Sequence, residues 1–283
     1  MNILLILSIV LFMGVQGIAR KNYGIAVSGR GPYLFNAGSC LFAALFFWAS
    51  GGFKYSIDPA VIPYSVGFAA TFGASVFFGF KALMSGPLSL TSLVTSYSLM
   101  IPTFYGLIFM NEPTSVFLYV GLVLLAVSLF CIAFKKGDTQ ISLKWAVYAV
   151  LALTGNGICS TILSVQQLNF EGAYKNEFMI TALVILVIFL FLMSFKNERK
   201  DARECFKAGF GWMIVWGILN GATNLFVMIL ATRMPASLMY PLISGGGIIC
   251  AWILSRFLYK EKLTAMQNVA IVLGIFSVVF LNI

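Results

Sequence analysis

Long apolar runs divide the chain into segments of membrane length, and each run ends at charged residues, prolines or clustered glycines. A helix of about 20 mostly apolar residues crosses a hydrocarbon core of about 30 Å. The pattern predicts an all-α integral membrane protein with ten transmembrane helices. These cover residues 2–19, 32–53, 61–83, 88–110, 114–134, 143–167, 177–195, 209–231, 236–258 and 264–282.

The composition agrees with this prediction. Of the 283 residues, 60% are apolar and 10% are charged, whereas a soluble domain has about 45–50% apolar and about 25% charged residues. A soluble catalytic domain is therefore excluded. There is no histidine, and the five cysteines form no C-x-x-C pair, so we expect no disulfide framework, metal or cofactor.

The basic residues are distributed unevenly among the predicted loops. The net charge is +9, which in a soluble domain would suggest nucleic acid. Here fifteen of the eighteen Lys and Arg residues fall in the odd-numbered loops, and the even-numbered loops hold Lys54, Lys175 and Arg233. The positive-inside rule then predicts a multi-pass protein of the cytoplasmic membrane, with odd-numbered loops in the cytoplasm and both termini outside. Membrane lipid, rather than nucleic acid, is the expected partner of this charge.

Two stretches of the chain can be laid over each other. GASVFFGFKALMSGP (73–87) and GATNLFVMILATRMP (221–235) both begin with glycine and end with proline at the same spacing. At the same offset Ser96 matches Ser244, and after a one-residue insertion Glu112 of FMNEPT matches Glu261 of YKEKLT. Two consecutive repeats of five spans are predicted.

The repeats cover residues 1–137 and 138–283 within a single transmembrane domain. Because each repeat has an odd number of spans, the second must enter the bilayer from the opposite side. Such inverted-topology repeats are a recurring device of secondary transporters, which bind their substrate near the midplane between the repeats.

Two segments carry a resemblance to a known family. MPASLMYPLISGGGIICAWILSRFLYKEKLTAMQNVAIVLGIFSVVFLNI (234–283) resembles the end of an EamA-type transporter of the drug/metabolite transporter superfamily. GPLSLTSLVTSYSLMIPTFYGLIFMNEP (86–113) resembles the fourth helix of its first half. The resemblance implies ten helices in two inverted five-helix repeats, alternating access, and transport of small organic solutes. Small multidrug resistance relatives carry a glutamate in their first helix, where this chain has Gln16.

The nine acidic residues all fall in predicted loops or at predicted helix ends. With no carboxylate or histidine inside a predicted span, there is no obvious proton relay or counter-ion for a cationic drug. Catalysis that needs a carboxylate or an imidazole as base is disfavoured as well. We therefore expect a protein that is not an enzyme.

Neutral polar residues inside the spans are the candidates for substrate binding. An unpaired amide in hydrocarbon costs several kcal/mol, so these side chains must face one another or a wet cavity. Interhelical hydrogen bonding is the alternative to a substrate site. The candidates are Gln16, Asn156, Asn220, Asn224, Ser96, Tyr97, Tyr240 and Ser244.

Prolines and glycines mark candidate hinges. Pro241 removes a helix hydrogen bond, and Gly245, Gly246 and Gly247 follow it closely; Pro102 lies within the fourth span. Such residues allow helix distortion, although tight helix packing uses the same residue types.

These features predict a secondary transporter that moves a small neutral or zwitterionic metabolite, such as an amino acid, through an uncharged site. A multidrug exporter that binds organic cations among aromatic rings is the nearest alternative. A membrane-embedded enzyme or lipid-carrier flippase subunit is an alternative of another class. The sequence does not decide the oligomeric state, and a homodimer is one possible form.

Overall fold

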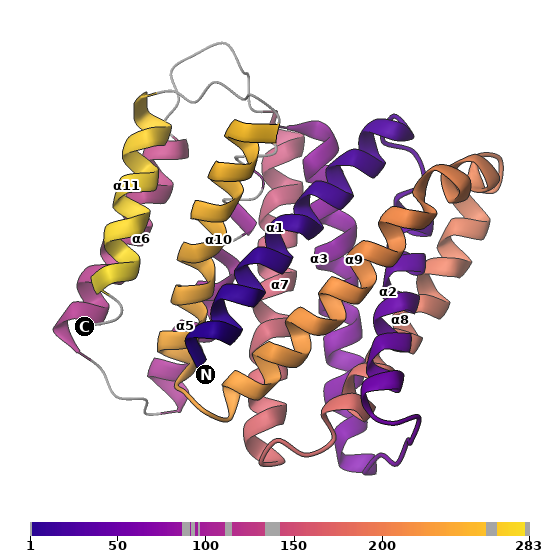
Figure 1. Cartoon of the computed structure of the whole chain (residues 1–283), viewed down its shortest axis with the longest axis horizontal. Coiled ribbons are helices and arrows are strands. Elements are labelled where there is room, and N and C mark those ends of the chain that lie inside the picture. The colour runs from indigo at the N-terminus through magenta and orange to yellow at the C-terminus, as the bar shows by residue number, and fades with distance from the viewer. Residues whose placement is uncertain are drawn as a thin grey trace.

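The computed structural model describes residues 2–86, 91, 94–95, 97–110, 115–133, 142–258 and 265–280. Within these ranges the chain is helical and contains no strand (Figure 1). Three residues used in the repeat alignment or the candidate site, Ser96, Glu112 and Glu261, lie outside the described residues.

Short connections join consecutive helices within the described ranges, as between α1 and α2 or α7 and α8. The first half contains α1 (Asn2–Ala26), α2 (Pro32–Ser50), the 3-10 turn η1 (Pro59–Val61), α3 (Ile62–Ser85), the 3-10 turn η2 (Tyr97–Leu99), α5 (Met100–Phe109) and α6 (Val116–Ala133). The second half contains α7 (Leu143–Asn169), α8 (Lys175–Asn197), α9 (Ala202–Ala231), α10 (Ala236–Leu258) and α11 (Ala265–Phe280).

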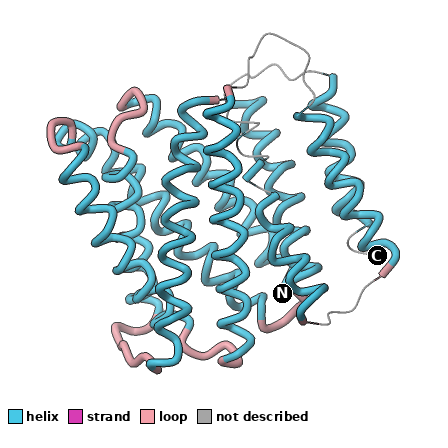
Figure 2. Tube along the Cα trace, turned by 180° about the vertical axis from the view of Figure 1, so that it is seen from behind, coloured by secondary structure: helices cyan, strands magenta, loops and turns pink. Residues whose placement is uncertain are grey.

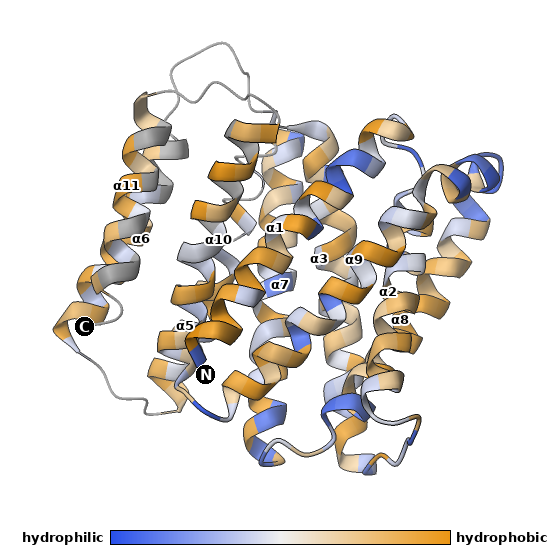
Figure 3. Cartoon of the chain, viewed as in Figure 1, coloured by the Kyte–Doolittle hydropathy of each residue, from blue (hydrophilic) through white to orange (hydrophobic). Residues whose placement is uncertain are grey.

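Six helical segments among the described residues are long and apolar enough to cross a membrane: α1, α2, η1 with α3, α7, α8 and α9. Helices of this size, 19 to 30 residues, extend about 29–45 Å at about 1.5 Å per residue. Figure 3 shows their middle parts as largely apolar, with most hydrophilic residues at the helix ends and connections and a few within the helices, as on α7. Large apolar side chains on the outside remain exposed, including Val116 at 76% and Phe195 at 68%, as expected of a surface that faces lipid.

Helix α1 packs antiparallel against α9. The rings of Phe12 and Phe226 lie 5.9 Å apart, and two turns further along α1 the Arg20 guanidinium lies 5.0 Å from the Trp216 ring. As the α1 partner moves toward the C-terminus, the α9 partner moves toward the N-terminus, which fixes the antiparallel direction.

Helices α3 and α7 are related in the same way. At one end Asn169 donates a hydrogen bond of 2.9 Å to the Tyr64 hydroxyl, and toward the other the rings of Phe78 and Tyr148 stack 6.0 Å apart. The third helix of each half therefore packs antiparallel against the first helix of the other half.

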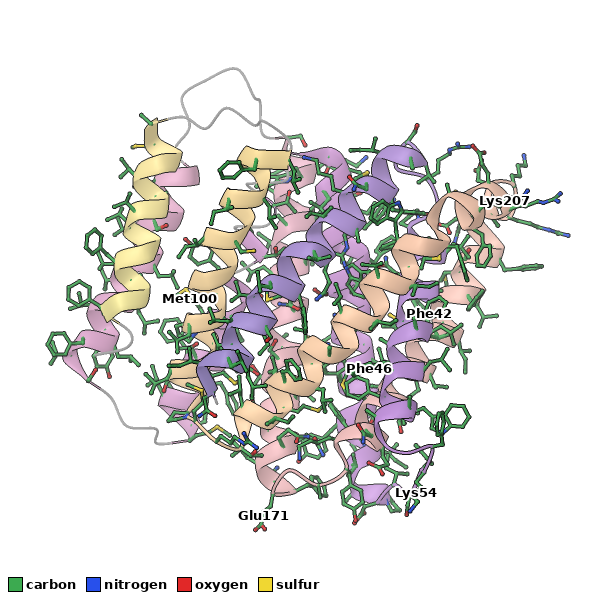
Figure 4. The ribbon with its side chains drawn as sticks, in the orientation of Figure 1. Phe42, Phe46, Lys54, Met100, Glu171 and Lys207 are labelled. Carbon is green, nitrogen blue, oxygen red and sulfur yellow. The ribbon has the colours of Figure 1, made fainter. Side chains whose placement is uncertain are left out.

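Close approach at glycine brings α9 onto α2. Gly217 lies against the backbone at Ser39, and Gly221 lies against the Phe46 ring; an added Cβ would meet their atoms at 2.4 Å and 2.6 Å. Figure 4 labels Phe42 and Phe46 where α9 crosses α2. These small residues let the two helices approach closely, against backbone at Gly217 and against a ring at Gly221, which is a typical contact of membrane helices.

Helices α6 and α11 lie side by side at one end of the bundle in both views (Figures 1 and 2). The Ser128 hydroxyl donates to the Ala270 carbonyl at 2.6 Å, and the Ser277 hydroxyl donates to the Gly121 carbonyl at 2.7 Å. The two bonds help to fix the register of this otherwise largely apolar pair of helices.

Candidate functional site

A cavity of about 270 Å³ opens between five helices. Its wall is formed by α1, α3, α7, α9 and α10, with Thr91, Thr95 and Leu99 completing it. Asn156 and Trp216, both in the lining, stand near the middle of α7 and α9. The cavity therefore lies about halfway along the long helices, and its volume is close to the lower end, about 300 Å³, of typical small-molecule sites.

A chain of amides joins α1 to α9 on one side of this cavity. The Gln16 amide donates to the Thr223 hydroxyl at 3.0 Å and accepts from the Asn220 amide at 3.3 Å. Asn224 in turn donates to the Asn220 side-chain oxygen at 3.2 Å. Gln16 and Asn220 are 8% and 7% exposed, so these bonds satisfy polar groups that would otherwise be costly at this depth.

A second polar group lies on α7 and reaches α10. The Asn156 amide donates to the Ser98 hydroxyl at 2.6 Å. The Tyr240 hydroxyl donates to the Ser160 carbonyl at 2.9 Å and lies 2.7 Å from the Ser164 hydroxyl. The Asn156–Ser98 bond joins the two halves of the chain, and the Tyr240 bonds join α10 to α7 within the second half.

Arg20 also lines the cavity, although the sequence pattern placed it in the loop after residues 2–19. Helix α1 continues to Ala26, because no proline or glycine pair interrupts it before Gly29. Arg20 then follows Gln16 by one turn on the same face. Its guanidinium lies over Trp216 at 5.0 Å, and its Nε is buried without a hydrogen-bond partner. The sequence pattern predicted an uncharged cavity. The structure instead places one charged side chain, Arg20, in its lining.

The remaining wall is largely apolar. Phe68, Phe72 and Val76 contribute from α3, Leu163 from α7 and Ile243 from α10. A cavity with polar groups on two sides and an apolar wall can hold a small solute that has a polar head and an apolar side chain.

The other candidate residues lie elsewhere. Tyr97 is buried outside the cavity lining, where its hydroxyl donates to the Leu125 carbonyl at 3.1 Å. Ser244 is buried on α10 and is absent from the lining. Pro102 is buried in α5, and Pro241 lies inside α10.

The glycines after Pro241 lie in different places. Gly247 lines the cavity, Gly246 faces the Val10 side chain of α1, and Gly245 is buried. Close packing and the cavity thus share this stretch of α10.

An acidic residue binds the N-terminus of α2 at one end of the bundle. The Glu198 carboxylate accepts from the backbone N–H groups of Tyr33 at 2.8 Å and Leu34 at 2.9 Å. It caps α2, whose own N-cap, Gly31, has no side chain. Burial raises the pKa of Glu198 above its ordinary value, and the two backbone bonds oppose that rise. Nearby, Arg30 forms ion pairs with Asp201 and Glu204. Its hydrogen bonds to Glu204 and Asp201, and then their charges, raise the pKa of Arg30.

Metal-type ligands do not gather in the described part of the chain, where no three His, Cys, Asp or Glu side chains come together. The polar and aromatic groups in the lining of the cavity are amides, hydroxyls, rings, the Cys159 thiol and one guanidinium.

Among known proteins, the chain is similar to solved structures in its fold. No protein-family model matches the chain, and no curated protein matches it. A crystal structure of a protein is similar over 96% of this chain and 95% of its own, with a TM-score of 0.69 and 15% sequence identity. The whole fold is shared. At this identity the likeness bears on the fold alone, and the function rests on the cavity.

Proposed function

We propose that the protein is a secondary transporter of the EamA type, in the drug/metabolite transporter superfamily, and that it moves a small organic solute by alternating access. The observation that carries the proposal is the cavity, which the first and third helices of both halves, α1, α3, α7 and α9, enclose about halfway along their length. A polar cavity at that depth, between two related halves, is the usual place of a transporter's substrate site.

The proposed architecture is ten spans in two inverted repeats. Its support is the equivalence of the packing: α1 lies against α9 as α7 lies against α3. The two hydrogen bonds between α6 and α11 are related in the same way. Their donors, Ser128 and Ser277, are 149 positions apart, and so are their acceptors, Gly121 and Ala270. Equivalent helices run in opposite directions in Figure 1, as α1 and α7 illustrate.

The proposed orientation places the odd-numbered loops in the cytoplasm and both termini outside. Figure 4 labels Lys207 at one edge of the bundle and Lys54 and Glu171 at the opposite edge. Lys207 belongs to the side that carries most of the basic residues, so the positive-inside rule favours the cytoplasm for it.

The proposed solute is a small metabolite that carries no net positive charge, such as an amino acid. Arg20 in the lining repels a cation, which weighs against export of cationic drugs. The amides of Gln16 and Asn156 offer donors and acceptors, and the rings of α3 offer an apolar surface. Transport would proceed by rocking the first four helices of each half against each other, with α10 bending at Pro241.

The test is uptake by proteoliposomes that hold the purified protein. A panel of radiolabelled amino acids and other metabolites is offered with and without a pH gradient. The proposal predicts saturable uptake of at least one small solute above that of protein-free liposomes. Absence of uptake and of counterflow for the whole panel, in both orientations of the protein, would overturn it.

A further inference from the structure

Arg20 is the one cation in the lining of the described cavity, and no carboxylate lines it. The six acidic residues in the described ranges lie in connections or in the first turns and ends of helices: Asp58, Glu171, Glu177, Glu198, Asp201 and Glu204. Arg20 is thus a charge at membrane depth for which the described part of the protein provides no counter-ion. Buried charges in membrane proteins are paired, or they mark a substrate pathway.

The neighbours of Arg20 hold it in place without neutralising it. Trp216 offers a ring face at 5.0 Å, and a ring face compensates a desolvated cation only in part. Gly79 on α3 leaves room for the guanidinium, since a Cβ at that position would lie 3.3 Å from Nη1. Because Nε has no hydrogen-bond partner, part of the donor fork is unused.

The amide chain begins one helical turn away. Gln16 and Arg20 are four residues apart on α1, and Asn220 and Trp216 are four residues apart on α9. Each pair lies on one helix face, and all four residues line the cavity. A guanidinium therefore stands beside neutral hydrogen-bonding groups, with the apolar wall of α3 completing the enclosure. This arrangement is complementary to a solute whose acid group faces the guanidinium, whose adjacent polar group faces the amides and whose apolar part faces the wall of α3.

We infer that the transported solute carries a carboxylate and that Arg20 binds it. The inference rests on the proposed function, and it narrows the solute to organic acids and amino acids. The planar fork of arginine matches a carboxylate with two parallel hydrogen bonds, which an amide or an ester of the same shape cannot accept with the same strength. A solute without the acid group leaves the cation unpaired in the cavity.

Matched pairs of acid and primary amide test the inference by binding. Leucine and leucinamide, and phenylalanine and phenylalaninamide, are titrated against the purified protein while its unfolding temperature is followed. For a pair that binds, the acid is expected to bind at least about tenfold more tightly than the amide, because a charge-assisted bond is lost with the amide. Arg20→Gln should abolish this preference, and Arg20→Lys should keep part of it, since lysine retains the charge without the fork.

Lys21→Gln is the matched control. It removes the same charge from the next position of α1, which does not line the cavity, and it should leave the preference unchanged. Arg20→Gln that still prefers the acid, or wild-type protein that binds acid and amide equally, would overturn the inference.

Two further readouts separate this inference from the transport proposal. Without solute, Arg20→Gln should be at least as heat-stable as the wild type, because it removes an unpaired cation; a lower unfolding temperature would indicate a structural arginine and contradict the inference. Acid-selective binding without uptake in proteoliposomes would overturn the transporter and keep the carboxylate site. Uptake that is equal for acid and amide, in the wild type and in Arg20→Gln, would keep the transporter and overturn the site.

Discussion

Gly73 and Gly221 each pack against a large side chain, and the two contacts are equivalent in the two halves of the chain. A Cβ on Gly73 of α3 would lie 2.7 Å from Cδ1 of Leu186 on α8, and a Cβ on Gly221 of α9 would lie 2.6 Å from Cδ1 of Phe46 on α2. In both places a glycine on the third helix of one half packs against a side chain on the second helix of the other half. The two glycines are also the first residues of the matching segments 73–87 and 221–235. The packing at these two glycines thus supports the proposed internal repeat.

Filling either glycine should destabilise the protein by a similar amount. Gly73→Leu and Gly221→Leu force the facing side chain to move, and such overpacking costs about 1–3 kcal/mol. Thermal or chemical unfolding in detergent measures the loss. Gly211→Leu is the control, because nothing lies within 4 Å of a Cβ at that position, and it should have little effect. Two glycine variants as stable as this control would show that the contacts are loose.

Much of the fold follows from the apolar runs, because a membrane-length apolar segment can satisfy its backbone polar groups only as a helix. The ends of the helices are less predictable. A charge usually stops a span, yet α1 passes through Arg20, since the cavity and Trp216 accommodate the guanidinium. Helix α9 begins at Ala202 rather than at residue 209, because its charged first turns lie at the edge of the bundle.

The residues of the candidate site also differ in how well the sequence predicts their position. The spans predicted from the sequence contained Gln16, Asn156 and Asn220, and the structure brings all three to one cavity. A buried amide must find a partner, so its place in an apolar run is informative. Tyr97 gives no such signal, because a tyrosine can bury its hydroxyl against a backbone carbonyl far from any cavity. Arg20 could have been found from its spacing of four residues after Gln16.

Removing an amide from the cavity should strongly reduce transport and leave the protein folded. In Asn156→Leu and in Asn220→Leu a solute loses a hydrogen-bonding group, at a cost of about 1–3 kcal/mol, so uptake should fall by about tenfold or more. Proteoliposome uptake gives the rate, and gel filtration checks the fold. Asn197→Leu makes the same change at an exposed helix end and should transport as the wild type does. Unchanged uptake in both cavity variants would contradict the assignment of the site.

The cap on α2 should make stability depend on pH in a defined direction. Because burial raises the pKa of Glu198, the folded protein takes up this proton at a higher pH than the unfolded chain does. The contribution of Glu198 is therefore fully present below the ordinary pKa of 4.5 and is lost as the pH rises through the folded pKa. The unfolding temperature of the wild type, minus that of Glu198→Gln, should fall between pH 4.5 and neutrality. A difference that rises with pH over this interval would indicate a lowered pKa.

The two edges of the bundle should face opposite sides of the membrane. Lys54→Cys and Lys207→Cys, each introduced into a protein without native cysteines, place a thiol at an exposed position on one edge. A membrane-impermeant maleimide added to intact cells should label position 54, and position 207 should react only after the membrane is opened. Labelling of both positions from the same side is incompatible with the proposed topology.

The most direct test of alternating access is the accessibility of the cavity from each side of the membrane. Ser75 lines the cavity on α3, and Ser75→Cys in a protein without native cysteines changes only one atom. A membrane-impermeant thiol reagent should modify this cysteine from the outside and, in inverted vesicles, from the inside, and a transported solute should slow both reactions. Modification from one side alone, under every condition of solute and gradient, would contradict alternating access.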